Sequence, residues 1–166
     1  MKKIDDGARG FTLIELLVVI SIISLMSSVV LASLTTARTK AADTAIKANL
    51  RNIKSAAELY LSNNGSYGDP LVSNTGGAGD GTPCPTSGNY MFADSRIAAG
   101  IAQSWQLGDP TFNTSVCAIG PNGQTWAIQT RLKSSNSPWC IDSAGFVGLA
   151  NITGGGSSNA ICDDGS

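Results

Sequence analysis

The chain contains no histidine, and this absence removes both the commonest general base of enzymes and a frequent zinc ligand. Its cysteines lie far apart in the sequence, so it has no Cys-x-x-Cys pair of the kind that binds zinc or performs redox chemistry. Serines are so numerous that none stands out as a nucleophile. We therefore expect a protein that is not an enzyme and that carries no cofactor.

Cysteine is missing from the chain before Cys84, and all four cysteines follow in the C-terminal part. An even number of cysteines in an exported domain suggests disulfides, and four cysteines allow three pairings. We favour Cys84 with Cys117, which would fasten a long loop to a sheet. Cys140 with Cys162 would then hold down a glycine-rich tail.

Charge is nearly absent between Leu13 and Leu34, where Glu15 is the one charged side chain. These roughly 22 residues would form a helix about 33 Å long, which is enough to span a bilayer. A buried core helix is one alternative, although a domain of this size rarely buries so long a helix that is apolar on every face. A cleaved secretory signal is another, since Lys2, Lys3 and Arg9 precede the run. The run exceeds the apolar region of such signals, and no small-x-small site closes it.

A carboxylate inside a membrane helix is costly, so Glu15 requires an explanation. One explanation is a specific cation that pairs with it. The other is that Glu15 lies near the lipid headgroups and only marks the end of the helix.

The string GFTLIE, from Gly10 to Glu15, resembles the class III signal of type IV pilins and type II secretion pseudopilins. In that family a prepilin peptidase, which is also an N-methyltransferase, cuts after the glycine and methylates the next residue. The resemblance implies cleavage between Gly10 and Phe11 and methylation of Phe11. It also implies that Glu15 pairs in the filament with the N-terminal ammonium of a neighbouring subunit, where either charge alone would be unfavourable.

The same resemblance implies the partners and the location. The precursor would cross the cytoplasmic membrane once, with its leader inside and its head outside. An inner-membrane assembly platform would then add it to identical or related pilin subunits in a cell-surface or envelope filament. The family often has a helix-kinking proline where this chain has Ala32, and this difference favours pseudopilin-like or minor branches.

No proline interrupts residues 36–63, and apolar residues recur there at helical spacing, from Ile46 to Tyr60. The pattern predicts that the helix continues and ends near Gly65, which can adopt a left-handed cap. One helix from Phe11 to Asn63 is too long for an ordinary domain of this size. The expected fold class is therefore α+β, a pilin-like lollipop whose long helix packs on a small antiparallel sheet.

The remaining sequence predicts a head with one core. Glycine, proline, serine and asparagine dominate Ser62–Asn89, which is typical of a long loop or a disordered linker. A short helix is expected at Ala93–Trp105, followed by a meander of three or four strands. The expected strands are Ser115–Ile119, Trp126–Leu132, Trp139–Asp142 and Phe146–Leu149. The expected core aromatics are Tyr60, Tyr90, Phe92, Trp105, Trp126, Trp139 and Phe146. The segment WCIDS, Trp139–Ser143, also resembles pilin-like proteins, more weakly than the N-terminal motif does.

These patterns divide the chain into four regions. We expect a cleaved leader at 1–10, a transmembrane and filament-core helix at 11–35, an amphipathic continuation at 36–63, and the head at 64–166.

Charge is distributed unevenly along the chain. The bases from Arg38 to Lys54 make the helix after the apolar run basic, whereas acids outnumber bases from Ser55 onward. Lipid headgroups or acidic heads of neighbouring subunits are the expected partners of the basic segment, and nucleic acid is an unlikely one. Asp163 and Asp164 are candidates for a calcium site, because some pseudopilins bind calcium near the C-terminus, but EF-hand spacing is missing.

Two functions of different class are compatible with the sequence. The favoured one is a structural subunit, a pilin or pseudopilin, that polymerises through its N-terminal helix. The alternative is a monomeric, signal-anchored extracellular binding domain, similar to an adhesin, in which the GFTLIE string is accidental.

Overall fold

The computed structural model describes residues 10–73, 84–85, 87–108, 116–155 and 158–165. Residues 1–9 of the expected leader, residues 74–83 of the expected loop, and Ser115 lie outside this set. The chain forms two compact units, Met1–Arg38 and Thr39–Ser166. One helix, α1 (Leu13–Asn64), contributes to both of them.

The helix α1 ends where the sequence predicts. The amide of Gly65 donates a hydrogen bond to the carbonyl oxygen of Leu61 over 2.7 Å. Gly65 has a φ of 77°, a left-handed conformation that glycine adopts without strain. A tight turn forms at residues 120–123, since the amide of Gly123 donates a hydrogen bond to the carbonyl of Gly120 and Gly123 has a φ of 62°.

The second unit is built around a five-stranded antiparallel sheet with the strand order β1-β2-β3-β4-β5. Its strands are β1 (Leu71–Ser73), β2 (Val116–Ile119), β3 (Trp126–Arg131), β4 (Pro138–Asp142) and β5 (Val147–Leu149). Between β1 and β2 the chain forms the short 3-10 helix η1 (Met91–Ala93) and the helix α2 (Ser95–Leu107). A separate hairpin pairs β6 (Asn151–Gly155) with β7 (Ser158–Asp163).

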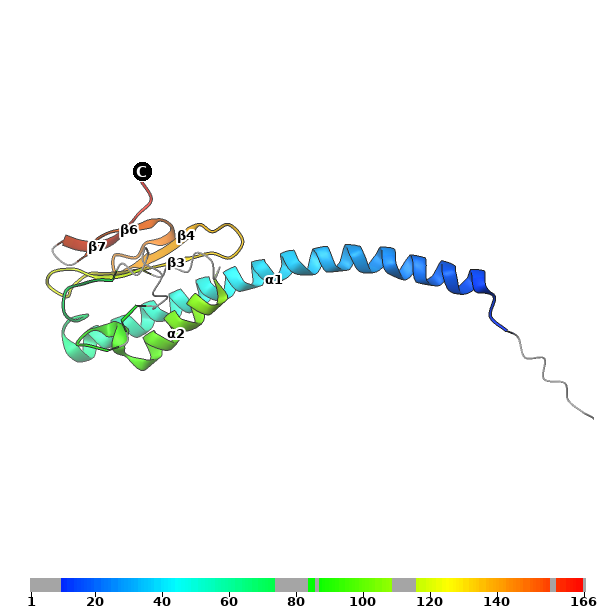
Figure 1. Ribbon diagram of the computed structural model, residues 1–166. Coiled ribbons are helices and arrows are strands. Elements are labelled where there is room, and N and C mark those ends of the chain that lie inside the picture. Colours follow the sequence, from blue (N-terminus) through cyan, green and yellow to red (C-terminus); the bar gives the residue numbers. More distant parts are fainter. Residues whose placement is uncertain (1–9, 74–83, 86, 109–115, 156–157, 166) are drawn as a thin grey trace, which may run out of the picture. The chain divides into compact units, whose positions relative to one another are not determined.

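The C-terminal part of α1 and the helix α2 cover one face of this sheet (Figure 1). Ile46, Leu50 and Ile53 of α1 are buried with Ile97 and Ile101 of α2. On the sheet, alternate residues of the central strands point into the same core, because side chains in a strand alternate between the two faces. These sheet residues are Cys117, Ile119, Trp126, Ile128 and Ile141.

The hairpin β6–β7 covers the opposite face. The sheet residues under it are small, namely Ala118, Ala127 and Cys140, and they pack with Ala160 and Cys162 of β7. Small side chains on both layers let the hairpin approach the sheet closely, and the apolar contact is supplemented by Phe146 and Ile152. Both faces of the central strands are therefore buried.

The α+β fold class is confirmed, but the sheet is larger than the sequence predicted. The expected meander of three or four strands is a five-stranded sheet, because β1 adds an edge strand from within the glycine-rich loop. The expected glycine-rich tail is the β6–β7 hairpin. Glycine and asparagine disfavour strands, so these elements depend on tertiary contacts that composition does not reveal.

Of the expected core aromatics, Phe92 and Trp126 are fully buried. Tyr60, Tyr90 and Trp139 pack against the helix-side core, and Phe146 packs on the hairpin side. Trp105 lies half-buried near the end of α2 and outside both clusters. Tyr67 is also buried in this core, as is Met91, which the sequence did not single out.

The structure joins Cys84 to Cys117 and Cys140 to Cys162, with Cα atoms 5.6 and 5.9 Å apart, which is the pairing favoured from the sequence.

A variant that begins near Ala41 keeps most of the second unit and loses the apolar part of α1. We expect this variant to be soluble and monomeric by light scattering. Peptide mapping without reduction should show these two disulfides and no free thiol. A bond between Cys84 and either Cys140 or Cys162 would contradict the pairing.

Candidate functional site: the N-terminal segment

The first turn of α1 is closed by a reciprocal pair of residues, Thr12 and Glu15. The backbone amide and the hydroxyl of Thr12 donate hydrogen bonds to Oε2 of Glu15, over 3.0 and 2.8 Å. The amide of Glu15 in turn donates to the hydroxyl of Thr12, over 3.3 Å. This is a capping box, in which each side chain accepts a hydrogen bond from a helix-terminal amide that lacks an intrahelical partner.

The sequence contains a signal for this arrangement that was not used in predicting the site. Thr12-Leu-Ile-Glu15 matches the S/T-x-x-E pattern that begins many helices. Glu15 therefore has a hydrogen-bond partner within its own chain, Thr12. This agrees with the explanation that Glu15 marks the end of the helix. Its second oxygen, Oε1, accepts no hydrogen bond from any described residue and remains open to a cation.

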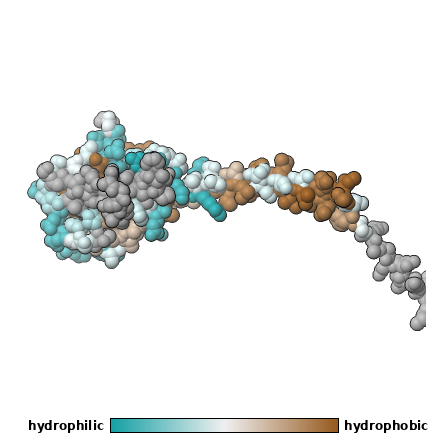
Figure 2. Space-filling model, viewed as in Figure 1, coloured by the Kyte–Doolittle hydropathy of each residue, from teal (hydrophilic) through white to brown (hydrophobic). Residues whose placement is uncertain are grey.

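The large apolar side chains of α1 from Leu13 to Leu34 are not covered by any described residue. Phe11 is 82% exposed, and large apolar side chains from Leu13 to Leu34 are all exposed. Figure 2 shows the resulting apolar surface on this part of the helix. By length and composition, α1 contains one segment that could cross a membrane.

Three serine hydroxyls in this segment donate hydrogen bonds to carbonyl oxygens of their own helix. Ser21 donates to the carbonyl of Leu17 and Ser24 to that of Ile20, each over 2.8 Å. Such bonds lower the cost of placing a hydroxyl in lipid or in a protein interior that excludes water. The segment therefore suits an apolar environment along its length.

After the apolar segment, α1 is basic from Arg38 to Lys54, and the one acidic side chain in this part is not exposed. Asp43 is buried, and its Oδ1 accepts hydrogen bonds from the backbone amides of Lys133 and Ser134, over 2.7 and 3.3 Å. The Ser134 hydroxyl also donates to its other oxygen. Asp43 thus fixes α1 to the turn between β3 and β4, a role that its place among bases in the sequence did not suggest.

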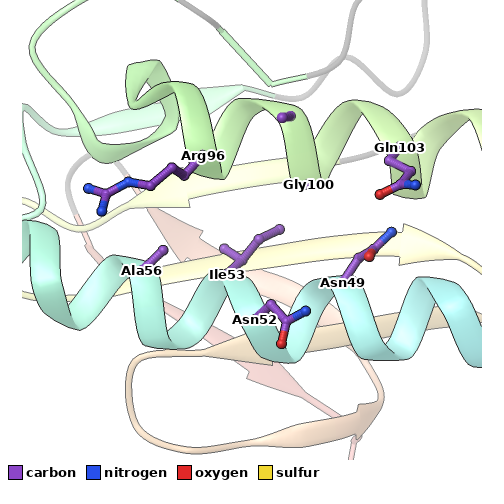
Figure 3. Close-up of a pocket in the computed structure, with 8 residues that line it drawn as sticks. Asn49, Asn52, Ile53, Ala56, Arg96, Gly100 and Gln103 are labelled. Atoms are coloured by element: carbon purple, nitrogen blue, oxygen red, sulfur yellow. The ribbon is translucent and has the colours of Figure 1, made fainter.

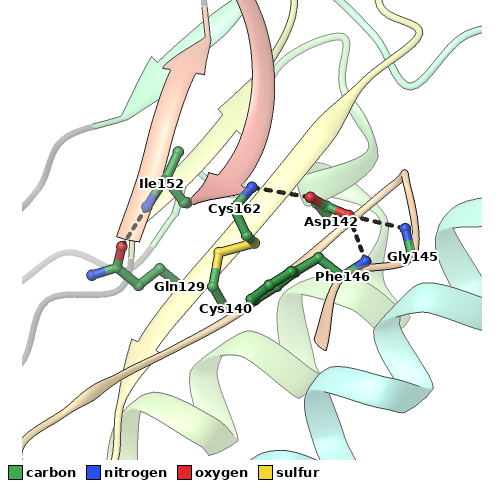
Figure 4. Close-up of a disulfide and its surroundings, with 7 residues drawn as sticks. All are labelled: Gln129, Cys140, Asp142, Gly145, Phe146, Ile152 and Cys162. Atoms are coloured by element: carbon green, nitrogen blue, oxygen red, sulfur yellow. Dashed lines mark hydrogen bonds between the residues drawn. A yellow bond between two sulfur atoms is a disulfide. The ribbon is translucent and has the colours of Figure 1, made fainter. Parts of the chain in front are cut away.

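A second buried carboxylate organises the far face of the sheet. Asp142 is only 2% exposed. Its Oδ1 accepts from the amides of Gly145 and Phe146, over 3.0 and 2.9 Å, and its Oδ2 accepts from the amide of Cys162, over 3.0 Å (Figure 4). One side chain of the WCIDS segment therefore holds the β4–β5 turn and the hairpin strand β7 together, next to the disulfide of Cys140.

A polar groove of about 330 Å³ lies between α1 and α2 in the second unit. Asn49 and Asn52 approach it from α1, and Gln103 and Arg96 from α2, while Gly100 lies against Ile53 at its floor (Figure 3). Arg96 is already paired with Asp94, the N-cap of α2, over 3.0 Å. Hydrogen bonding to this guanidinium holds the pKa of Asp94 below its ordinary value.

The candidate calcium residues, Asp163 and Asp164, line another open groove beside Asn151 and Thr153. Oδ1 of Asp163 accepts a hydrogen bond from the amide of Gly165 over 2.8 Å. Within the described part of the chain, no three acidic, cysteine or histidine side chains gather closely enough to hold a metal ion.

Residues 6–31 match the family described as the prokaryotic N-terminal methylation motif. The chain is also 45% identical over 61 residues to the type IV wide pilus major component PilA4 of Thermus thermophilus. The chain is thus similar to proteins that carry this motif and to a type IV pilus component.

The similarity to PilA4 covers 37% of this chain and 47% of that protein, so the chain spans about half the length of the relative. No solved structure matches the chain significantly.

Proposed function

We propose that this chain is a structural subunit, a pilin or pseudopilin, which polymerises through its N-terminal helix into a type IV pilus or a type II secretion-type filament. The observation that carries the proposal is the apolar surface of α1 from Leu13 to Leu34, which the described chain leaves uncovered. Such a surface needs lipid before assembly and neighbouring helices afterwards. The methylation motif at the start of this helix supports the same order, in which the segment lies first in lipid and then among neighbouring helices.

Maturation would occur at the start of this helix. A prepilin peptidase would remove residues 1–10 by cutting between Gly10 and Phe11, and would methylate Phe11. The precursor would cross the cytoplasmic membrane once, with its leader inside and its head outside. The core helix at 11–35, its continuation at 36–63 and the head at 64–166 would then enter a surface or envelope filament through the assembly platform.

Within the filament, Glu15 would pair with the N-terminal ammonium of a neighbouring Phe11. The capping box supports this role, because it holds the carboxylate in place through Oε2 and leaves Oε1 without a partner among the described residues. A preorganised acceptor loses less conformational freedom when its partner arrives. The pair would be effective in an apolar core, where each charge alone is strongly disfavoured.

The intact mass of the protein purified from its native membrane tests this proposal. We expect a chain that begins at Phe11 and carries one added methyl group, recovered both from membranes and from sheared filaments. A chain that keeps Met1 and occurs only as a monomer would instead indicate a signal-anchored binding domain and would reject the filament subunit.

A further inference from the structure

The strand β5 forms one edge of the sheet, and the backbone groups of two of its three residues point outward. The register pairs Trp139 with Leu149, Cys140 with Gly148, and Ile141 with Val147. The flanking ladder bonds are Asp142 to Phe146 and Ala150 to Pro138. Because hydrogen-bonded and non-hydrogen-bonded pairs alternate in an antiparallel ladder, Val147 and Leu149 are the non-bonded residues. Their N–H and C=O groups face away from β4.

No described residue covers these outward groups. Neither Val147 nor Leu149 has a backbone hydrogen bond across the outer edge, and the two residues are 37% and 54% exposed. An uncovered strand edge is a template for another extended chain. The edge offers two donors and two acceptors at strand spacing.

The edges of the β6–β7 hairpin in the same unit differ from the β5 edge, because their outward amides have hydrogen-bond partners. The outward amides of Ile152, Ala160 and Cys162 donate to side chains of the sheet. Their acceptors are Gln129, Thr125 and Asp142, and Figure 4 shows two of these bonds. These side chains block strand addition at the described hairpin edges, so the open edge of β5 is not a general property of this head.

A row of cations borders β5 on its helix-facing side. Nζ of Lys47 lies 4.2 Å from the ring centre of Trp139, the partner of Leu149. At the other end, Nζ of Lys54 lies 3.5 Å from the position that a Cβ on Gly145 would occupy. Arg51 is exposed on the same side of α1, since residues 47, 51 and 54 follow helical spacing.

These cations have no carboxylate partner within ion-pair distance among the described residues. The nearby Glu58 is engaged by Tyr67, whose hydroxyl donates to it over 3.1 Å. The exposed side chains of Val147 and Leu149 share the helix-facing side with the cations, so the edge combines apolar contact, open hydrogen-bonding groups and positive charge.

We propose that the β5 edge is a docking site for an extended, acidic segment of another protein, which adds to the sheet as a sixth strand. Main-chain hydrogen bonds to Val147 and Leu149 would hold the segment. Its acidic side chains on the helix side would face Lys47, Arg51 and Lys54. The edge is short, so the interaction is weak and transient rather than permanent. This inference is independent of whether the chain forms filaments.

The test uses the full chain in detergent and a fluorescent peptide of eight residues that alternates glutamate and valine. We expect saturable binding by fluorescence anisotropy. A peptide with lysine in place of glutamate should bind at least about tenfold more weakly, because its charges oppose three cations. Peptides N-methylated at alternate residues provide a second readout. One register should abolish binding and the other should preserve it, because only every second amide of an added strand faces its neighbour.

A matched pair of variants tests the backbone contact. Leu149→Pro removes an outward N–H but no bond to β4, and proline is tolerated on edge strands. Leu149→Ala removes only apolar side-chain surface. We expect Leu149→Pro to weaken peptide binding about tenfold and Leu149→Ala to weaken it less. Arg51→Glu combined with Lys54→Glu should reverse the preference toward the lysine peptide. A denaturant transition like that of wild type, measured without reduction, would show that each variant is folded.

Several outcomes would overturn the proposal. The absence of binding at millimolar peptide would do so, as would binding that is equal for both N-methylation registers or unaffected by Leu149→Pro. Protection of the Val147 and Leu149 amides from hydrogen exchange in filaments, without peptide binding to the free chain, would show that a second copy covers the edge instead.

Discussion

Glu15→Ala subunits are expected to enter the membrane and to be cut after Gly10 as efficiently as wild type, yet to yield few or no filaments. Removing the carboxylate makes the helix more apolar, so insertion does not suffer. Each incoming subunit would instead bury an N-terminal ammonium without a counter-ion, at a cost of about 3 to 5 kcal/mol by analogy with broken buried pairs. The measurement is the yield of sheared filaments relative to the membrane pool, in cells that lack wild-type subunits.

The capping box makes a sharper comparison available. Glu15→Gln removes the charge, but glutamine also serves in a capping box, so the helix start is kept. Thr12→Ala does the reverse. It removes the capping hydroxyl, which lowers the stability of the helix by about 1 kcal/mol, and it keeps the carboxylate of Glu15. We expect Glu15→Gln to fail in assembly and Thr12→Ala to assemble nearly normally. The opposite pattern would mean that Glu15 acts only as a helix-end residue.

Gly10→Val serves as the control for processing. A bulky side chain at the cut should block the peptidase, so this variant is expected to accumulate with its leader attached. Glu15→Ala should not accumulate in this form. Mature-size protein from Gly10→Val, expressed with its peptidase, would remove the case for a class III leader.

Asp142→Ala is expected to destabilise the head by about 3 kcal/mol, a large part of the stability of a domain of this size. The substitution leaves three backbone amides without their acceptor. An unsatisfied buried donor lowers the stability by about 1 to 3 kcal/mol, whereas an exposed donor forms a hydrogen bond with water and lowers it much less. Cys162, in the hairpin strand β7, is buried against the sheet, while Gly145 is exposed, so most of the loss comes from the amide of Cys162.

Denaturant unfolding of the variant that begins near Ala41, without reduction, measures this loss. Asp142→Asn keeps one acceptor oxygen and should fall between wild type and Asp142→Ala. Asp43→Ala is the matched control at the other buried carboxylate. Its amide partners, Lys133 and Ser134, belong to exposed residues that water can reach, so its loss should be smaller. Equal losses at Asp43 and Asp142 would contradict this explanation.

The sequence alone determined those features that depend on local spacing and composition. The uncharged run after Glu15 indicated a segment that is long and apolar enough to cross a membrane. The apolar residues at helical spacing from Ile46 to Tyr60 predicted the inner side of α1, and the structure buries all of them except Tyr60, which is half-buried. Gly65 marked the end of that helix for a backbone reason that is local to one residue. The strands from β2 to β5 were recognisable because their side chains alternate and turn residues separate them. Helix spacing, strand alternation and glycine caps all act within a few residues, so a single chain displays them.

Only the tertiary structure decided the roles that depend on residues distant in the sequence. Asp43 and Asp142 have the same side chain as any surface acid, and only the fold brings them to backbone amides far along the chain. The strands β6 and β7 have little intrinsic strand preference and are held by Gln129, Thr125 and the disulfide to Cys140. The open edge of β5 likewise follows from register, because a shift of one residue would turn its outward groups toward β4. Burial and hydrogen bonding are properties of partners in space, and composition does not specify those partners.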